Sequence, residues 1–204
     1  PFRQVIIAPV VTNDEKRILE NLSRAGRRLM GFCRTNIFKR LESSGYAFLL
    51  TLKRHLLRNY VYIYVCQNGL DIPIGKNEML NFDDYIDDED IEAADENIIN
   101  GSENNYLNNA KRVYEDIYLV NKKRFDWLNS NLFENSIINE LKHDCDLIQS
   151  ILEIGRDWEE ENDRKLIALY RLIVNKHPNE KILVFTQYAD TAKYIFNYLK
   201  LKNV

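Results

Sequence analysis

The sequence predicts a mainly α-helical protein, a helical bundle followed by a truncated α/β unit. Gly and Pro number only 7 and 4 among 204 residues, so few residues interrupt long helices. Apolar residues make up 45% of the chain and mostly recur at the three- to four-residue spacing of amphipathic helices. The pattern changes at residues 182–185 (ILVF), a continuous apolar run typical of a strand buried on both faces of a parallel sheet. A helix, one buried strand and another helix make up only part of an α/β unit.

Two helical stretches are expected in the first third of the chain. The first begins at residues 12–15 (TNDE), where Asn13 can cap the helix and two acidic residues favour the helix dipole. Its apolar face extends to Leu29. The second runs from about residue 36 to residue 66 and is expected to bend at Gly45, because Gly costs about 1 kcal/mol relative to Ala inside a helix.

Three more amphipathic helices are expected in the second half, and they should pack together as a bundle. They cover residues 106–129, 135–152 and 157–176. A last helix should follow the apolar run at 182–185, with Asp190 as its capping residue.

Three connecting segments are not expected to be helical. Residues 5–11 (VIIAPVV) predict an edge strand or a packed linker, because Pro9 lacks a backbone donor. Residues 67–75 (QNGLDIPIG) are rich in turn formers. Residues 77–105 are acidic, and they indicate either a solvated tether or a nucleic-acid mimic that covers the basic helices.

The chain is therefore expected to have four parts. A basic helical segment covers residues 1–76, and an acidic loop or tether covers residues 77–105. A helical bundle covers residues 106–176, and the first strand and helix of a truncated α/β domain cover residues 177–204.

Charge is strongly segregated along the chain, although the net charge is only −3. Residues 1–60 carry 12 Lys/Arg against 4 Asp/Glu, whereas residues 61–110 carry 1 against 12. Residues 111–204 carry 15 of each. A basic block of this kind indicates contact with nucleic acid or with an acidic partner.

The cysteines and the hydropathy indicate the compartment. Cys33, Cys66 and Cys145 are far apart and form no CxxC pair, which favours reduced thiols in a cytoplasmic protein. His143 and Cys145 form an HxC pair, but no second pair completes a zinc site. No apolar run approaches 18 residues in length, so no membrane span is expected.

Two blocks of sequence resemble a known family. Residues 38–44 (FKRLESS), followed by an Ala-Phe pair at 47–48 and a Thr-Leu pair at 51–52, resemble a helical block after the first motor lobe of RapA-like members of the Swi/Snf branch of superfamily-two helicases. Asp163 and the residues just after it, then residues 180–192 (EKILVFTQYADTA), are similar to the entry of the second lobe and its motif usually numbered four. The resemblance covers about residues 20–75 and 160–200; residues 106–155 carry no matching motif.

The resemblance implies a fragment of an ATP-dependent DNA helicase or translocase. The fragment would span the helical region between the lobes and the first strand and helix of a second, RecA-like lobe. The family's phosphate loop, GxxxxGK[S/T], is missing, because the GxxxxG from Gly26 to Gly31 is followed by Phe32 and Cys33. We therefore expect no catalytic residue, cofactor or metal site in this chain, whereas the intact parent would bind ATP and magnesium and hydrolyse ATP.

The basic residues of the first block are the candidates for DNA contact. Lys39 and Arg40, with Arg27, Arg28 and Arg34 upstream, would contact phosphates and give weak, sequence-independent binding. The alternative is an ordinary solvated helix face, with Glu42 forming local ion pairs.

Thr186 and Gln187 are candidates at the carboxyl end of the expected strand, the edge at which open α/β sheets bind ligands. A hydroxyl and an amide there can donate to a phosphate, or the two residues form a simple strand-to-helix turn.

The expected partners are DNA, the remaining motor lobes of the parent, and a second copy of the chain through the unpaired strand. No membrane partner is expected. The alternative function is a helical protein–protein interaction module with the acidic segment as its docking strip, which would be less sensitive to salt than phosphate binding.

Overall fold

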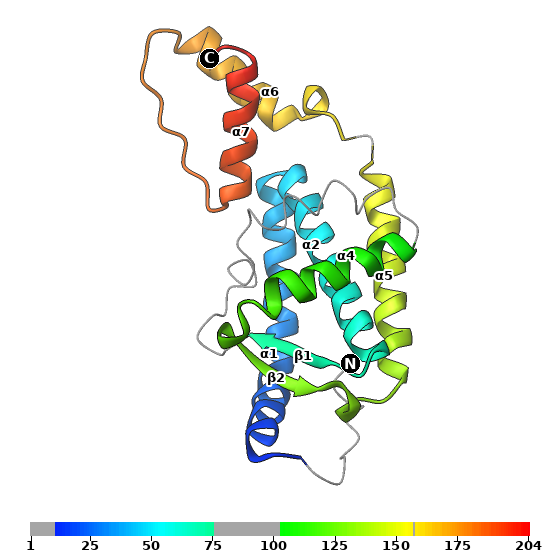
Figure 1. The fold of residues 1–204 in the computed structure, drawn as a ribbon. Helices are drawn as coiled ribbons and strands as arrows, with labels where there is room; N and C mark the ends of the chain where they lie inside the picture. Colours follow the sequence, from blue (N-terminus) through cyan, green and yellow to red (C-terminus); the bar gives the residue numbers. More distant parts are fainter. Residues whose placement is uncertain (1–10, 76–102, 157) are drawn as a thin grey trace. The chain divides into compact units, whose positions relative to one another are not determined.

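A computed structural model describes residues 11–75, 103–156 and 158–204 (Figure 1). These residues are mainly helical, as expected, with one two-stranded antiparallel sheet among them. Most of the predicted strand or linker at 5–11 and of the acidic segment at 77–105 lies outside the described residues. The main elements are α1 (Asn13–Ser43), α2 (Gly45–Gln67), β1 (Asp71–Gly75), α4 (Glu103–Val113), β2 (Phe125–Asn129), α5 (Ser136–Ile154), α6 (Arg164–Arg171) and α7 (Ala189–Leu201).

The first helix begins with a reciprocal pair of hydrogen bonds. The Glu15 backbone N–H donates to Thr12 Oγ1 at 3.2 Å, and the Thr12 backbone N–H donates to Glu15 Oε2 at 2.9 Å. This is a capping box, and the hydrogen bond from the Thr12 backbone holds the pKa of Glu15 below its usual value. The capping residue is therefore Thr12, and the prediction of Asn13 was wrong by one position.

The two helices expected before residue 66 divide at a different place. The structure has one helix, α1, across residues 29–36, and the break lies at Ser44. The predicted weak point at Gly45 therefore marks a real interruption, whereas the boundary predicted between residues 29 and 36 was wrong. Ser44 Oγ accepts a hydrogen bond from the Ala47 backbone N–H at 3.4 Å, which caps the start of α2.

The chain forms two compact units. The first contains residues 11–30, 53–75 and 103–151 among those described. Its core is centred on α2, which is apolar on almost every side and contributes several fully buried side chains. These are Leu56, Leu57, Val61, Ile63 and Val65.

The sheet of the first unit corrects two predictions. Strand β1 lies in the segment expected to form only turns, and β2 lies inside the helix expected over residues 106–129. The strands are antiparallel, with Ile72 opposite Leu128. The Tyr114 hydroxyl, in a π-helical turn after α4, donates to the Asp71 carbonyl at 2.9 Å and holds the strand to that turn. Pairing with β1 and these contacts override the helical periodicity of residues 125–129.

Two tyrosines of α2 pack against other aromatic rings of the first unit. Tyr60 is 5% exposed and stacks on Tyr106 at 4.9 Å between ring centroids. The rings of Tyr64 and Tyr114 pack edge-on, with their centroids 6.0 Å apart. Burial raises the pKa of the nearby Tyr118 phenol to about 12.

The second unit contains residues 31–52, 152–156 and 158–204 among those described. Its core is formed by Leu166, Tyr194 and Tyr198. Asp163 caps α6, because its Oδ1 accepts from the backbone N–H groups of Lys165 and Leu166 at 3.0 and 3.1 Å. The predicted helix over 157–176 thus begins later, at α6, and ends in a π-helical turn, Leu172–Lys176.

The expected strand at 182–185 is not buried. Its residues pair in a ladder with no other described residue, so the described chain does not form a parallel sheet. Leu183 and Phe185 are 83% and 89% exposed. The RecA-like unit therefore remains a prediction. No described helix combines the length and the hydropathy needed to cross a membrane.

Candidate functional site

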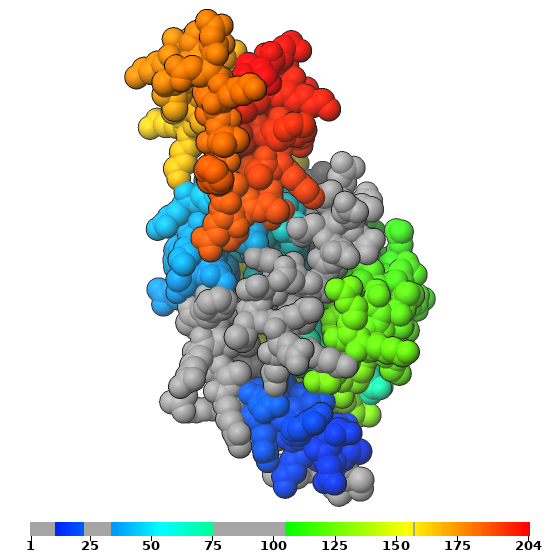
Figure 2. Space-filling model, turned by 90° about the vertical axis from the view of Figure 1, so that its left-hand side faces the viewer, coloured from blue at the N-terminus to red at the C-terminus, as the bar shows by residue number. Residues whose placement is uncertain are grey.

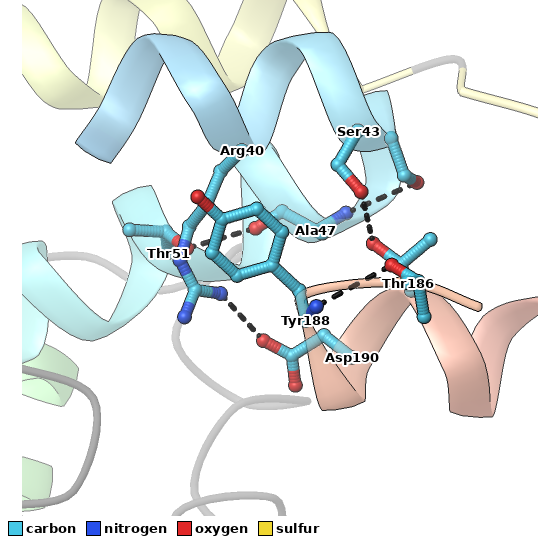
Figure 3. A network of polar contacts seen from close by, with 9 residues as sticks. Arg40, Ser43, Ala47, Thr51, Thr186, Tyr188 and Asp190 are labelled. Carbon is cyan, nitrogen blue, oxygen red and sulfur yellow. Dashed lines mark hydrogen bonds and ion pairs between the residues drawn. The ribbon is translucent and has the colours of Figure 1, made fainter. Parts of the chain in front are cut away.

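The second unit contains a buried polar network between the end of α1 and the start of α7 (Figure 3). Arg40, in the last turn of α1, directs Nη1 to Asp190 Oδ2 at 2.7 Å. The two side chains are only 5% and 4% exposed. At this separation and burial, the pair is a charge-assisted hydrogen bond largely excluded from water.

Tyr188 covers the Arg40 guanidinium. The Arg40 Cζ atom lies 4.7 Å from the centroid of the Tyr188 ring, a cation–π distance. The Tyr188 backbone N–H donates to Thr186 Oγ1 at 3.3 Å, so the turn before α7 is held by its own side chain. The Tyr188 hydroxyl is buried and has no hydrogen-bond partner among the described atoms.

Further contacts extend the network on both sides of the ion pair. The Ser43 and Thr191 hydroxyls share a hydrogen bond of 2.9 Å, and Lys165 Nζ donates to the backbone carbonyl of Glu42. At the start of α2, the Tyr46 ring stacks on the Tyr194 ring with centroids 4.7 Å apart and planes 5° apart.

Tyr194 connects this network to the start of α6. Its hydroxyl donates to Asp163 Oδ2 at 3.2 Å and accepts from Trp158 Nε1 at 3.4 Å. Burial is the main cause that raises the pKa of the Tyr194 phenol, with smaller contributions from Asp163. The phenol therefore stays protonated and keeps its donor role at neutral pH. We refer to the side chains joined around the ion pair as the Arg40 junction: Arg40, Ser43, Tyr46, Tyr188, Asp190, Thr191 and Tyr194.

The predicted site residues fall into different environments. Arg40 is buried in the junction, with its guanidinium directed at a carboxylate, whereas Lys39 and Arg34 are exposed on α1. Arg34 lies over the Phe38 ring, with its Cζ 5.9 Å from the ring centroid. Arg27 and Arg28 lie in α1, but their side chains are outside the described part.

The residues predicted at the end of the strand lie beside the junction. Thr186 is half-buried and accepts from the turn, and Gln187 is exposed. Asp190 was expected to cap the last helix. The structure corrects this, because Tyr188 occupies the cap position, no side chain caps α7, and Asp190 binds Arg40 instead. Glu42 was expected to form local ion pairs, and its described contact is through its carbonyl oxygen.

Several residues in or next to the junction were not predicted as site residues. Ser43, Thr191 and Asp163 lie within the two blocks that resemble the helicase family, so that resemblance was the available signal for them. Tyr188 also lies in the second of these blocks, at residues 180–192. What the sequence could not show is that Arg40 and Asp190, 150 positions apart, share one buried site.

Within the described residues, no group of three or more His, Cys, Asp or Glu side chains is placed to hold a metal ion. The buried polar atoms of the junction mostly bind one another. Lys39 and Arg34 remain available on the surface for an anionic partner. Comparison with known proteins finds no matching family model, no matching curated protein and no matching solved structure.

Proposed function

We propose that this chain is the helical region between the two motor lobes of an ATP-dependent DNA translocase of the Swi/Snf type, with the beginning of its second lobe. In this role it transmits movement between the lobes and contacts the DNA backbone. ATP hydrolysis belongs to the parent protein. A cytoplasmic location is part of the proposal, because Cys66 and Cys145 are free thiols.

One observation carries the proposal. The two blocks that resemble the helicase family are about 140 residues apart in the sequence, yet their side chains form one buried network. Arg40 and Ser43 come from the first block, and Asp190 and Thr191 come from the second. An accidental resemblance in two unrelated surface segments would not be expected to produce complementary charges and hydroxyls at one site.

The chemistry of the network suits the transmission of force. A buried ion pair loses much of its stabilisation when either partner moves, because each charge would then lie unpaired in a low dielectric. The Arg40 junction therefore resists separation of α1 from α7 until a comparable free energy is supplied. Such an all-or-none contact can pass a displacement from one element to the other.

The exposed cations of α1 are the proposed DNA contacts. Lys39 and Arg34 are exposed, and neither contacts the Arg40–Asp190 pair in the described structure. Lys and Arg side chains on a helix face neutralise phosphates without reading the bases. Binding is therefore weak, independent of sequence and sensitive to salt.

The test compares two charge-matched double variants. Arg34→Glu with Lys39→Glu should weaken binding to any duplex about equally, and should reduce the slope of log affinity against log salt by about 2. The control is Arg171→Glu with Lys176→Glu, which reverses one exposed Arg and one exposed Lys elsewhere in the second unit. Fluorescence anisotropy on two unrelated duplexes is the measurement. Equal losses in both variants, or a loss that depends on base sequence, would contradict the proposed contact.

A helical protein-interaction module is the second candidate, and one observation favours it. Phe38 and Leu41 are 53% and 45% exposed on α1, although both are large and apolar. Binding to an apolar protein surface would change little with salt, whereas phosphate binding falls steeply. The salt titration described above therefore separates the two candidates.

A further inference from the structure

The exposed side of the last turns of α1 combines an aromatic ring with two cations. Phe38 is 53% exposed, although its side chain is large and apolar. The Arg34 guanidinium lies over the Phe38 ring, with Cζ 5.9 Å from the ring centroid, and Lys39 follows as the next exposed residue. Figure 2 shows this part of α1, in light blue, at the surface of the second unit. Contact with phosphates would use the two cations and leave the ring without a role.

The helical repeat brings these three side chains to one side of α1. Arg34 and Phe38 are four residues apart, so their side chains lie one above the other. Lys39 is rotated from Phe38 by about 100° around the helix axis. It stays on the exposed side, because Arg40, the residue after it, is the one that turns inward and is 4% exposed. The ring therefore lies between the two cations on the surface.

The charge around Phe38 favours an anionic partner. In the described part of the chain, neither Arg34 nor Lys39 forms an ion pair. Glu42 is the single acidic residue among residues 31–52. Lys165 Nζ donates to the carbonyl of Glu42 and so adds a third cation beside this end of α1. The surface around the ring is therefore positively charged.

We propose that Phe38 stacks on an unpaired base of single-stranded DNA, while Arg34 and Lys39 contact the phosphates on either side of that base. Proteins that bind single strands combine cations that follow the backbone with aromatic rings on which bases stack. Every base has a π face, so this contact tolerates any sequence. The proposal rests on the phosphate contacts of Arg34 and Lys39 proposed above, and it adds that the DNA at α1 includes an unpaired strand.

A single strand uses the ring in a way that a duplex does not. The bases of a duplex are stacked on one another, and only their edges are exposed in the grooves. Phe38 can therefore stack only on a base that has left the duplex. An apolar protein surface could also cover the ring, but it would bring no anionic groups to Arg34 and Lys39. The combination of ring and charge thus favours the single strand.

The test is a cycle of two proteins and two DNA strands, measured by fluorescence anisotropy with the complete chain. One strand is an oligothymidylate, and the other has the same length and phosphates but carries abasic sites. The wild type should bind the abasic strand about tenfold more weakly. Phe38→Leu keeps an apolar side chain without the π face. It should bind the oligothymidylate about tenfold more weakly than the wild type does, and the abasic strand and a duplex with unchanged affinity.

Phe185→Leu is the matched control. Phe185 is 89% exposed in the same unit, and none of the described cations lies over its ring. Its replacement should leave the affinity for both strands as in the wild type. A loss equal to that of Phe38→Leu would mean that any exposed ring has this effect, and the assignment to Phe38 would be wrong.

The remaining outcomes separate this proposal from the proposed function. Equal affinities of the wild type for the two strands would overturn the stacking contact and leave the phosphate contacts standing. Equal weakening of both strands by Phe38→Leu would also overturn it, because the ring would then act without touching a base. The phosphate contacts would fail differently: Arg34→Glu with Lys39→Glu would bind the abasic strand as tightly as the wild type does. A wild-type chain that binds neither strand would overturn both proposals.

Discussion

At the residue scale, the second unit contains a buried ion pair in which each charge depends on the other. Removing Arg40 and Asp190 from water costs several kcal/mol per ion, and their 2.7 Å contact offsets that cost only while both are present. The Tyr188 ring adds a cation–π contact that a neutral residue at position 40 would not receive. Loss of one partner should therefore lower the free energy of unfolding by much more than loss of a surface ion pair does.

We expect Arg40→Gln and Asp190→Asn each to destabilise the second unit by about 3–5 kcal/mol, because each leaves an uncompensated buried charge. The double variant should lose less than the sum of the two, since neither charge then remains. Urea unfolding followed by Trp158 fluorescence is the measurement. It requires a Trp127→Phe background, because the chain has 2 tryptophans and Trp127 lies in the first unit.

The matched control for this pair is Glu153→Gln. It removes an ion pair between Glu153 and Arg156, whose atoms lie 3.0 Å apart and whose side chains are 67% and 59% exposed, respectively. The free energy of unfolding should change by no more than about 1 kcal/mol. Strict additivity of the Arg40→Gln and Asp190→Asn losses would mean that the two residues do not act as a pair.

Sequence reasoning found these residues but not their partnership. Arg40 was interpreted as a phosphate contact and Asp190 as a helix cap, because each interpretation uses only neighbouring positions. The ion pair joins residues 150 positions apart, and no local pattern encodes that pairing. The capping error at Thr12 is smaller, since the Thr-x-x-Glu spacing of a capping box was present in the sequence.

At the element scale, the first residue of α2, Gly45, is closely packed. A Cβ atom on Gly45 would lie 2.3 Å from the Trp158 ring, well inside van der Waals contact. Glycine is required there for space, and its backbone freedom is not the reason. The start of α2 at Gly45 thus packs directly against the Trp158 ring, and the Nε1 of this ring donates to the Tyr194 hydroxyl.

Gly45→Ala should therefore destabilise the second unit, although alanine is the better helix former by about 1 kcal/mol. The rigid indole has to move, which also weakens its hydrogen bond to Tyr194. Gly155→Ala is the matched control, because its nearest neighbour, at 2.5 Å, is the end of the flexible Leu49 side chain. Thermal melts in the Trp127→Phe background should show a larger fall in Tm for Gly45→Ala. An equal or smaller fall would contradict the packing explanation.

The elements that sequence predicted well are those with long, local periodicity. Helix α5 lies within two residues of the range predicted at each end, and the interruption beside Gly45 was expected. Strands β1 and β2 were missed because each is short and gains its hydrogen bonds from the other, 50 to 58 positions away. The run at 182–185 carries the composition of a buried strand, but in the described chain it has no sheet to join.

At the scale of the whole molecule, the sequence contains no GxxxxGK[S/T] phosphate-loop motif. The GxxxxG beginning at Gly26 lies inside α1 and is followed by Phe32 and Cys33. A phosphate loop needs backbone N–H groups free to cradle oxygens and a Lys to reach the terminal phosphates, whereas a continuous helix uses its N–H groups internally.

We therefore expect no saturable binding of magnesium–ATP in the micromolar range and no ATP hydrolysis by this chain. Isothermal titration calorimetry and a phosphate-release assay are the measurements, with nucleotide injected into buffer as the control. A saturable isotherm with a stoichiometry near one would show that the fragment interpretation is wrong.

The separation of residues in the Arg40 junction has a consequence for biosynthesis. Arg40 leaves the ribosome about 150 residues before Asp190, which at about 5–20 residues per second is on the order of 10 s earlier. During that time α1 and α2 can form locally, but the Arg40 side chain, which is buried in the complete second unit, remains in water. The first unit, which needs nothing beyond residue 151, can fold ahead of the second. The first unit can therefore be folded while the second unit is still incomplete. The second unit can fold only after α7 has been synthesised.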